Sequence, residues 1–139
     1  MTTYTRQYQV KPDHIDSQGI VDGLYYPFYL EDCRHHYVRD ALNFDINKEA
    51  ANGINMVLSE YTLKFRKSLK MGDSFEVTCR GYQEEGKRTK LFFHQQIILA
   101  GTIYTEATFV ATCVPSTGGR PFIPESVVKA ISTLPAQSE

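Results

Sequence analysis

Long apolar runs are absent from this sequence of 139 residues. Its first ten residues, MTTYTRQYQV, lack the apolar stretch of a signal peptide, and nothing downstream approaches the run of about 20 apolar residues that a membrane-spanning helix needs. Cysteine is scarce too: the chain has only Cys33, Cys79 and Cys113. Their number is odd, and no two of them have a CxxC spacing. We therefore expect neither a disulfide framework nor a zinc site, and a reducing cytoplasm as the location.

A strong charge of either sign is also missing. The formal net charge is −1, so nothing global attracts the chain to nucleic acid or to an anionic membrane. The apolar fraction of 42% and the charged fraction of 22% are ordinary for a globular protein, and there is no internal repeat or low-complexity linker. We expect one domain with a single core over residues 1–139.

The first half of the chain predicts one strand and one long helix. Alternation predicts a strand over 4–10, and the Pro, Asp and Gly residues that follow predict an irregular segment up to 23. A helical pattern runs from about 24 to 42, with Pro27 in its first turn. Its apolar stripe consists of Tyr26, Leu30, Cys33, Tyr37 and Ala41. Arg34, Arg39 and Asp40 are expected to fall largely off that stripe.

The second half predicts strands. The segments 55–69, 73–85, 87–100 and 102–115 are rich in β-branched and aromatic residues and alternate, with short Gly-bearing turns between them. Residues 124–134 predict a short surface helix, followed by a frayed end. A helix with an apolar stripe, followed by four antiparallel strands, indicates an α+β fold in which a sheet wraps the helix.

The stretch DSQGIVDGLYYPFYLEDCR, residues 16–34, resembles the signature of the 4-hydroxybenzoyl-CoA thioesterase family of the hotdog superfamily. The matching positions are Asp16, the Gly-Ile-Val step at 19–21, Tyr26, and the YLE-x-x-R pattern over 29–34. The resemblance extends over roughly residues 4 to 130. It implies a long central helix wrapped by a five-stranded antiparallel sheet, and hydrolysis of an acyl-CoA or, in some relatives, an acyl-carrier-protein thioester.

The same resemblance implies roles for two positions. The catalytic carboxylate falls on Asp16, as nucleophile or as general base, and the amide that polarises the thioester carbonyl falls on Gly23. A helix N-terminus suits that second role, because its N–H groups are free and its dipole is positive. No metal or redox cofactor is implied, and coenzyme A enters as part of the substrate.

Other residues near the signature have two interpretations each. Asp22 departs from the family pattern; it is a helix N-cap, or a second carboxylate that raises the pKa of its neighbour. Glu31 pairs with Arg34 one turn along the helix, or is the catalytic acid, as in some hotdog thioesterases. Tyr26 lines the site or belongs to the core. Asp16 itself, with Ser17 and Gly19, is also a fair turn signature.

Histidine and cysteine give weaker signals. His14, His35 and His36 do not have metal-ligand spacing, and at most one of them is expected to line the site. Cys33 lies on the apolar stripe and is interpreted as a small buried hydrophobe.

Basic residues in two segments are candidates for the phosphates of coenzyme A. The first is the hairpin with Lys87, Arg88 and Lys90, and the second is KFRK at 64–67. Either could be only a solvated turn or strand surface.

Relatives of this fold pair two subunits into a continuous sheet with the active site between them. We therefore expect a homodimer at least, or a homotetramer formed back to back. Two alternatives to a thioesterase stay open: a non-catalytic hotdog protein that binds acyl-CoA or a related ligand, and a hydratase or dehydratase in which His14 works with Asp16.

Overall fold

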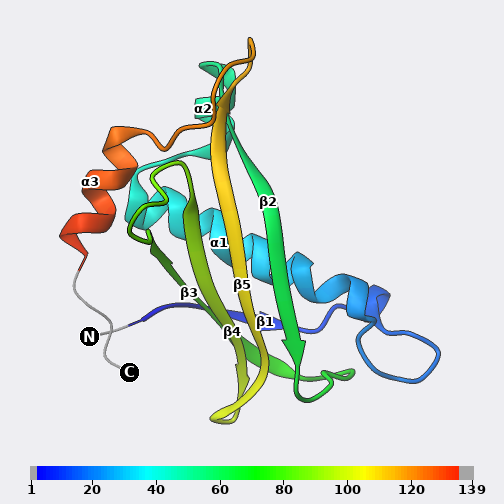
Figure 1. Ribbon diagram of the computed structural model, residues 1–139. Coiled ribbons are helices and arrows are strands. Elements are labelled where there is room, and N and C mark those ends of the chain that lie inside the picture. Colours follow the sequence, from blue (N-terminus) through cyan, green and yellow to red (C-terminus); the bar gives the residue numbers. More distant parts are fainter. Residues whose placement is uncertain (1–2, 135–139) are drawn as a thin grey trace.

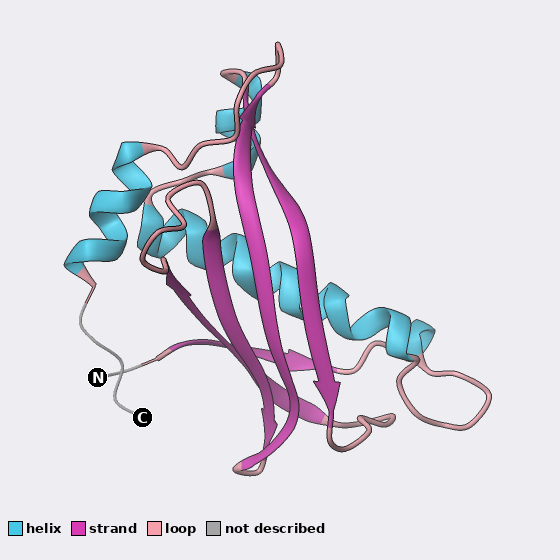
Figure 2. Cartoon of the chain, viewed as in Figure 1, coloured by secondary structure: helices cyan, strands magenta, loops and turns pink. Residues whose placement is uncertain are grey.

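One long helix lies across a five-stranded antiparallel sheet in the computed structural model, which describes residues 3–134 (Figures 1 and 2). The strands are β1 (Tyr4–Gln9), β2 (Ile54–Phe65), β3 (Ser74–Tyr82), β4 (Leu91–Leu99) and β5 (Thr102–Pro115), hydrogen-bonded in the order β1-β3-β4-β5-β2. The helices are α1 (Tyr26–Leu42), α2 (Ile46–Ala51) and α3 (Glu125–Thr133), with 3₁₀ turns η1 (Pro12–His14) and η2 (Gly23–Tyr25). This is the α+β arrangement predicted from the sequence.

Local chemistry sets both ends of α1. Asp22 caps the preceding η2 turn, and Pro27 stands in the first helical turn, where its missing N–H costs nothing. The helix stops at Asn43, whose φ of 56° is left-handed and whose N–H donates to the Val38 carbonyl. The helix thus begins two residues later than its periodicity suggests, because η2 forms the preceding turn.

The predicted apolar stripe of α1 packs on the sheet, and four of its five residues are buried, with Ala41 half-buried. Arg34 was expected off the stripe, and that prediction is wrong: the residue is only 4% exposed. Its guanidinium carbon lies 4.1 Å from the centre of the Phe109 ring on β5. The cation is therefore part of the interface between helix and sheet.

Three tyrosines of α1 hold separate backbone segments. Tyr26 Oη accepts a hydrogen bond from Leu69 N at 2.9 Å. Tyr29 Oη accepts one from Lys11 N at 3.0 Å, and Tyr37 Oη accepts one from Gly81 N at 2.8 Å. At Gly81 a Cβ atom would lie 3.1 Å from the Tyr37 ring, so glycine permits this close approach. These bonds tie the segment after β1, the segment after β2 and the end of β3 to the helix.

Strand β2 is an edge of the sheet. Among residues 3–134 it pairs only with β5, and the pairing is interrupted by a bulge between Leu58 and Glu60. Large apolar side chains stay exposed along it: Val57, Leu58, Tyr61 and Phe65. A long apolar edge strand can pair with a strand of another subunit.

The predicted strands and the C-terminal helix all form, and four of the five strands are shorter than predicted. Segment 87–100 loses its start to the hairpin loop, so β4 begins at Leu91. The short helix α2, capped by Asp45, was not predicted. The predicted frayed end after 134 lies outside the described residues. Within residues 3–134, no helix has both the length and the apolar character needed to cross a membrane.

Candidate active site

The first part of the family signature lies in a loop before the N-terminal end of α1, over residues 14–22. Its base is closed by a hydrogen bond of 2.9 Å from Asp22 N to the His14 carbonyl, and its outer part by one of 2.8 Å from Asp16 N to the Ile20 carbonyl. Val21 N donates to the Leu69 carbonyl at 2.8 Å, which ties the loop to the segment after β2. Asp16 therefore lies in a loop that is held by backbone hydrogen bonds, and Gly23 directly follows this loop at the start of η2.

Asp16 is half-buried, and its carboxylate closes a turn. Oδ1 accepts from Gln18 N at 2.7 Å, and Oδ2 accepts from Gln18 Nε2 at 3.2 Å. These bonds match the turn interpretation of the DSQG sequence. They also fix the carboxylate, and each oxygen keeps a second acceptor site for another donor.

Asp22 is the N-cap that one of its two interpretations predicted. Its Oδ1 accepts from Leu24 N at 2.9 Å, and its carbonyl accepts from Tyr25 N at 2.9 Å. The N–H of Gly23, between these residues, has no acceptor among residues 3–134. The residue is exposed, its φ is not positive, and a Cβ atom there would meet nothing within 4 Å. Neither backbone strain nor crowding within the chain requires glycine here.

Tyr26 connects the loop, the helix and β2. Its hydroxyl holds Leu69 N, and its ring packs edge-on against Phe65 with centres 5.0 Å apart. Burial raises the pKa of Tyr26, and the charges of Asp73 and Asp16 act in the same direction. Its hydroxyl therefore stays protonated and lies within electrostatic reach of the Asp16 carboxylate.

Apolar side chains stand open around the helix start. Leu24 is 81% exposed, and Tyr25 and Phe28 are also exposed. Tyr25 stacks on His14, with ring centres 4.1 Å apart and planes 8° apart. An exposed apolar group beside a free N–H is typical of a ligand or subunit contact.

His14 is buried beneath this group. Its Nδ1 lies 2.7 Å from Tyr29 Oη and shares a hydrogen bond with it, and the same hydroxyl accepts from Lys11 N. Burial lowers the pKa of His14, and the charge of Lys11 acts in the same direction. The neutral ring therefore supports the aromatic group at the helix start.

Glu31 lies eight residues after Gly23, about two helical turns away, and its side chain is 55% exposed. Its Oε1 is 3.8 Å from Arg34 Nη2, as the pairing interpretation predicted. Both residues line a cavity of about 350 Å³ between α1 and β2. Glu31 is thus separated from the loop of Asp16 within one chain.

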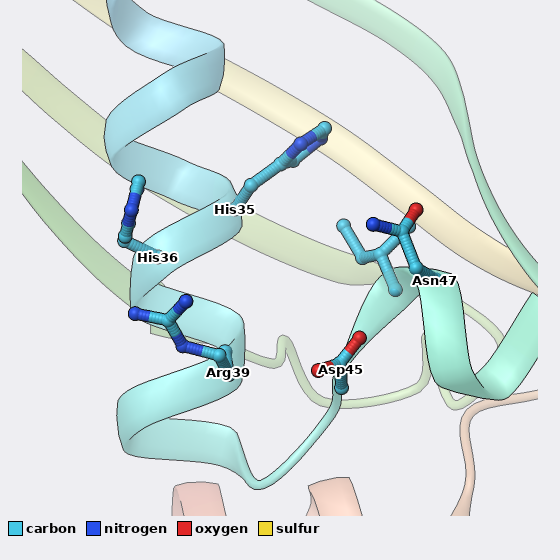
Figure 3. A pocket seen from close by; sticks show the side chains of 6 residues that line it. His35, His36, Arg39, Asp45 and Asn47 are labelled. Carbon is cyan, nitrogen blue, oxygen red and sulfur yellow. The ribbon is translucent and has the colours of Figure 1, made fainter.

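His35 lines the same cavity, and with His36 it also lines a second hollow of about 190 Å³ against α2. Figure 3 shows His35, His36 and Arg39 along α1, with Asp45 and Asn47 at the start of α2 facing them. Within residues 3–134, no group of three His, Cys, Asp or Glu side chains could hold a metal ion.

The hairpin candidates Lys87, Arg88 and Lys90 lie at the other end of α1. Lys87 Nζ pairs with Glu84 at 3.0 Å and lies 5.6 Å from the centre of the Phe92 ring. Strand β3 ends just after Gly81 and leads into this hairpin. Gly81 N donates a hydrogen bond to the hydroxyl of Tyr37. Tyr37 lies about 16 Å along the helix from Tyr26, so the hairpin is far from the helix start. One chain does not bring these cations to Asp16.

The segment 64–67, in contrast, adjoins the site through Phe65. Its Arg66 pairs with Glu106 at 2.8 Å, and Lys67 Nζ lies 5.6 Å from the centre of the Tyr104 ring.

A buried polar group was missed by the sequence reasoning. Gln95 on β4 is fully buried; its Oε1 accepts from Arg34 Nη1 at 3.1 Å, and its Nε2 donates to the carbonyls of Leu30 at 2.9 Å and Thr78 at 3.3 Å. The one available signal was Gln95 at an inward position of an alternating strand, which calls for a partner across the core.

Comparisons with known proteins place the chain in a family. The profile of the Thioesterase-like superfamily matches residues 10–131, and the chain belongs to this superfamily. An acyl-acyl carrier protein thioesterase of the Arabidopsis thaliana chloroplast is 29% identical over 72 residues, which are 52% of this chain and 37% of that protein. The chain thus matches little more than a third of the length of that relative.

Solved structures give the fold. A 1,4-dihydroxy-2-naphthoyl-CoA thioesterase from Synechocystis superposes with a TM-score of 0.82 at 16% identity, covering 96% of this chain and 98% of that chain. A Staphylococcus aureus protein solved in complex with CoA gives 0.85 at 15% identity, covering 99% and 89%. The predicted hotdog fold is confirmed, and the signature loop lies at the start of its central helix.

Proposed function

We propose that this protein hydrolyses an acyl-CoA thioester to the free acid and CoA, in the manner of the 4-hydroxybenzoyl-CoA thioesterase family. The observation that carries the proposal is the free N–H of Gly23 at the start of the η2 turn that leads into α1, directly after the loop that fixes the Asp16 carboxylate, in a chain of the Thioesterase-like superfamily. Acyl-carrier-protein thioesters are the other substrate form, since the Arabidopsis relative is named for them.

Gly23 supplies the electrophilic pull. When the thioester carbonyl is attacked, negative charge develops on its oxygen, and an N–H already positioned at a helix N-terminus stabilises that charge. No hydrogen bond within the protein has to break first, because the N–H has no acceptor among residues 3–134. The exposed Leu24, Tyr25 and Phe28 shield the reacting carbonyl from water when a ligand or second subunit covers them.

Asp16 either attacks the thioester carbonyl or activates the water that does so. As a nucleophile, its carboxylate oxygen bonds to the carbonyl carbon, the C–S bond breaks, CoA leaves as the thiolate, and water then cleaves the anhydride. As a general base, it takes a proton from water; the water oxygen bonds to the carbonyl carbon, the C–S bond breaks, and CoA leaves as the thiolate. Both routes need the carboxylate in its charged form and in a fixed position, and Gln18 holds it in place.

The remaining parts follow from the same proposal. The chain acts as a homodimer at least, or a homotetramer, because β2 presents a long apolar edge. Lys87, Arg88 and Lys90 reach the phosphates of coenzyme A from the partner subunit, or the segment 64–67 does so from the same subunit. The reaction needs no metal or redox cofactor, and it takes place in the cytoplasm.

Asp16→Asn tests the carboxylate. Thiol release is measured from short, long, branched and aromatic acyl-CoAs, with Asp13→Asn as the matched control, because Asp13 is an exposed acid on the same segment. We expect Asp16→Asn to lose at least about 100-fold in kcat, as for loss of a general base, and Asp13→Asn to stay near wild type. If Asp16→Asn stays active while Glu31→Gln does not, Glu31 is the catalytic acid.

Gly23→Pro tests the amide. Proline is tolerated at a first helical position, and the preceding Asp22 has the extended φ and ψ of −63° and 137° that a proline requires. The substitution therefore removes the N–H and little else, whereas Gly23→Ala keeps it. We expect Gly23→Pro to lower kcat by about 100-fold or more with nearly unchanged Tm. Equal activity of the two variants would remove Gly23 from the mechanism.

The competing function is a non-catalytic acyl-CoA-binding protein, favoured by the engagement of both Asp16 oxygens with Gln18. Binding of acyl-CoA without thiol release from any member of the panel would establish it. Addition of water to an enoyl-CoA, measured as a loss of ultraviolet absorbance, would instead indicate a hydratase that uses His14.

A further inference from the structure

The cavity of about 350 Å³ between α1 and β2 has the size of a ligand pocket. Most of its wall is apolar and comes from α1, α2, β2 and β5: Val38, Ile46, Met56, Val57, Leu58 and Ala111. Val57 and Leu58 are about two-fifths exposed in the single chain, so the cavity opens along the β2 edge, where a second subunit would border it. Such a wall suits the hydrocarbon part of an acyl group.

One cation interrupts the apolar wall. Arg34 is 4% exposed, and its hydrogen bonds within residues 3–134 use one of its five N–H donors, from Nη1 to Gln95. Nη2 is 3.8 Å from Glu31 Oε1, which is longer than a hydrogen bond. A buried guanidinium with spare donors beside a cavity is a site for an acceptor oxygen.

The charge of Glu31 determines which oxygen fits. Its carboxylate already balances the Arg34 charge, and a second carboxylate in the cavity would be repelled by it. A neutral acceptor, such as a hydroxyl or a ketone, takes the free donors without that repulsion.

The spacing along the helix sets the length of the ligand. Gly23 and Glu31 are eight residues apart, about 12 Å at 1.5 Å per residue. The guanidinium of Arg34 lies at the level of Glu31, because the two side chains approach each other. An extended chain advances about 3.4 Å for every three bonds, so about ten bonds separate a carbonyl at Gly23 from this cation.

We propose that this cavity binds the acyl group of the substrate, and that Arg34 selects a medium-length acyl group with a neutral oxygen at its distal end. This inference rests on the proposed thioesterase function and names its substrate class. His35 lines both this cavity and the neighbouring polar hollow shown in Figure 3. The distal end of a bound acyl group would therefore be in contact with water in that hollow.

The first test needs only the wild-type protein. The ratio of kcat/KM for 10-hydroxydecanoyl-CoA to that for decanoyl-CoA is expected to be about 10 or more, as for a hydrogen bond to a charged donor. Decanedioyl-CoA, with a distal carboxylate, is expected to gain nothing over decanoyl-CoA. A hydroxyl ratio near 1, or a preference for the dicarboxylate, would overturn the role of Arg34.

Two variants complete the test. Arg34→Met is expected to bring the hydroxyl ratio close to 1; because the ratio is taken within one preparation, partial unfolding does not alter it. Val57→Phe fills the cavity and is expected to lower kcat/KM for decanoyl-CoA at least tenfold relative to hexanoyl-CoA. Its matched control is Val128→Phe on α3, which is similarly exposed and lies outside the cavity. If Val57→Phe changes only the subunit assembly, a second copy fills the cavity and the inference is wrong.

Failure of the proposed function would look different. If the wild type releases no thiol from any of these compounds, the same comparisons are made by calorimetry with non-hydrolysable thioether analogues. A tenfold preference for the hydroxylated analogue that Arg34→Met abolishes would support the cavity assignment without catalysis. Equal affinities would overturn it.

Discussion

Replacing Gln95 by leucine is expected to be among the most destabilising single substitutions in the sheet. Gln95 is fully buried and holds three groups: the Arg34 guanidinium and the carbonyls of Leu30 and Thr78. The Thr78 carbonyl depends on the Gln95 side chain as its donor, because this part of β3 is not paired with β4. The described β3–β4 pairs pass over Thr78 and Cys79, and Gln96 N donates to the Thr78 hydroxyl at 3.0 Å in place of a ladder bond.

The magnitude follows from these three bonds. The bond to the Arg34 cation is worth about 1.5–3 kcal/mol, and the two neutral bonds about 1 kcal/mol each. Leucine has similar volume, so no cavity term is added, and the expected loss is about 3–5 kcal/mol of unfolding free energy. That is a large part of the roughly 5–15 kcal/mol of a typical domain.

Urea denaturation followed by circular dichroism measures this loss. Gln96→Leu is the matched control, because Gln96 is half-buried and contacts Glu106 on the other face of the sheet; its expected cost is below about 1 kcal/mol. Arg34→Met combined with Gln95→Leu should recover part of the loss, since it removes the stranded buried charge. A loss below about 1 kcal/mol for Gln95→Leu, or no recovery in the double variant, would refute this account.

Three further predictions concern single side chains. Tyr26→Phe leaves the buried Leu69 N–H without its acceptor and should cost about 1–3 kcal/mol by urea denaturation. Thr105→Val should raise stability by about 1 kcal/mol, because the buried Thr105 hydroxyl has no hydrogen-bond partner in the described part of the chain; no gain in Tm would contradict this. Arg66, His94 and Gln96 hold the pKa of Glu106 at about 2, below its ordinary value of 4.5. A depressed pKa stabilises the fold above the ordinary value, and that contribution is lost as the pH falls toward 2. Curves of Tm against pH for wild type and Glu106→Gln should therefore converge on acidification, and parallel curves would refute it.

The sequence contains most of the fold in its periodicities. The stripe of α1, the cap at Asp22 and the Gly-bearing hairpins are local signals, and each predicted element forms. Helix α2 was missed because six residues are too few to display a period; its only mark is Asp45, whose side chain accepts from Lys48 N.

The candidate site was predictable to a lesser extent. The cap formed by Asp22 on Leu24 N and the pair of Glu31 with Arg34 both join residues that are close in sequence. Their spacing is therefore visible in the sequence. The burial of Arg34 depends on Gln95, which is 61 residues away, and no helical pattern can show it. The distance between the hairpin with Lys87 and the loop of Asp16 likewise follows from the position of β3 against α1.

The three tyrosine hydroxyls of α1 have a consequence for local opening of the chain. The amides of Lys11, Leu69 and Gly81 lie far apart in the sequence, yet all three donate to this one helix. None of them can lose its acceptor while α1 stays docked, so their hydrogen–deuterium exchange should be slow and should follow a single opening event. The helix thus makes the loop of the candidate site, the turn after β2 and the end of β3 one cooperative unit.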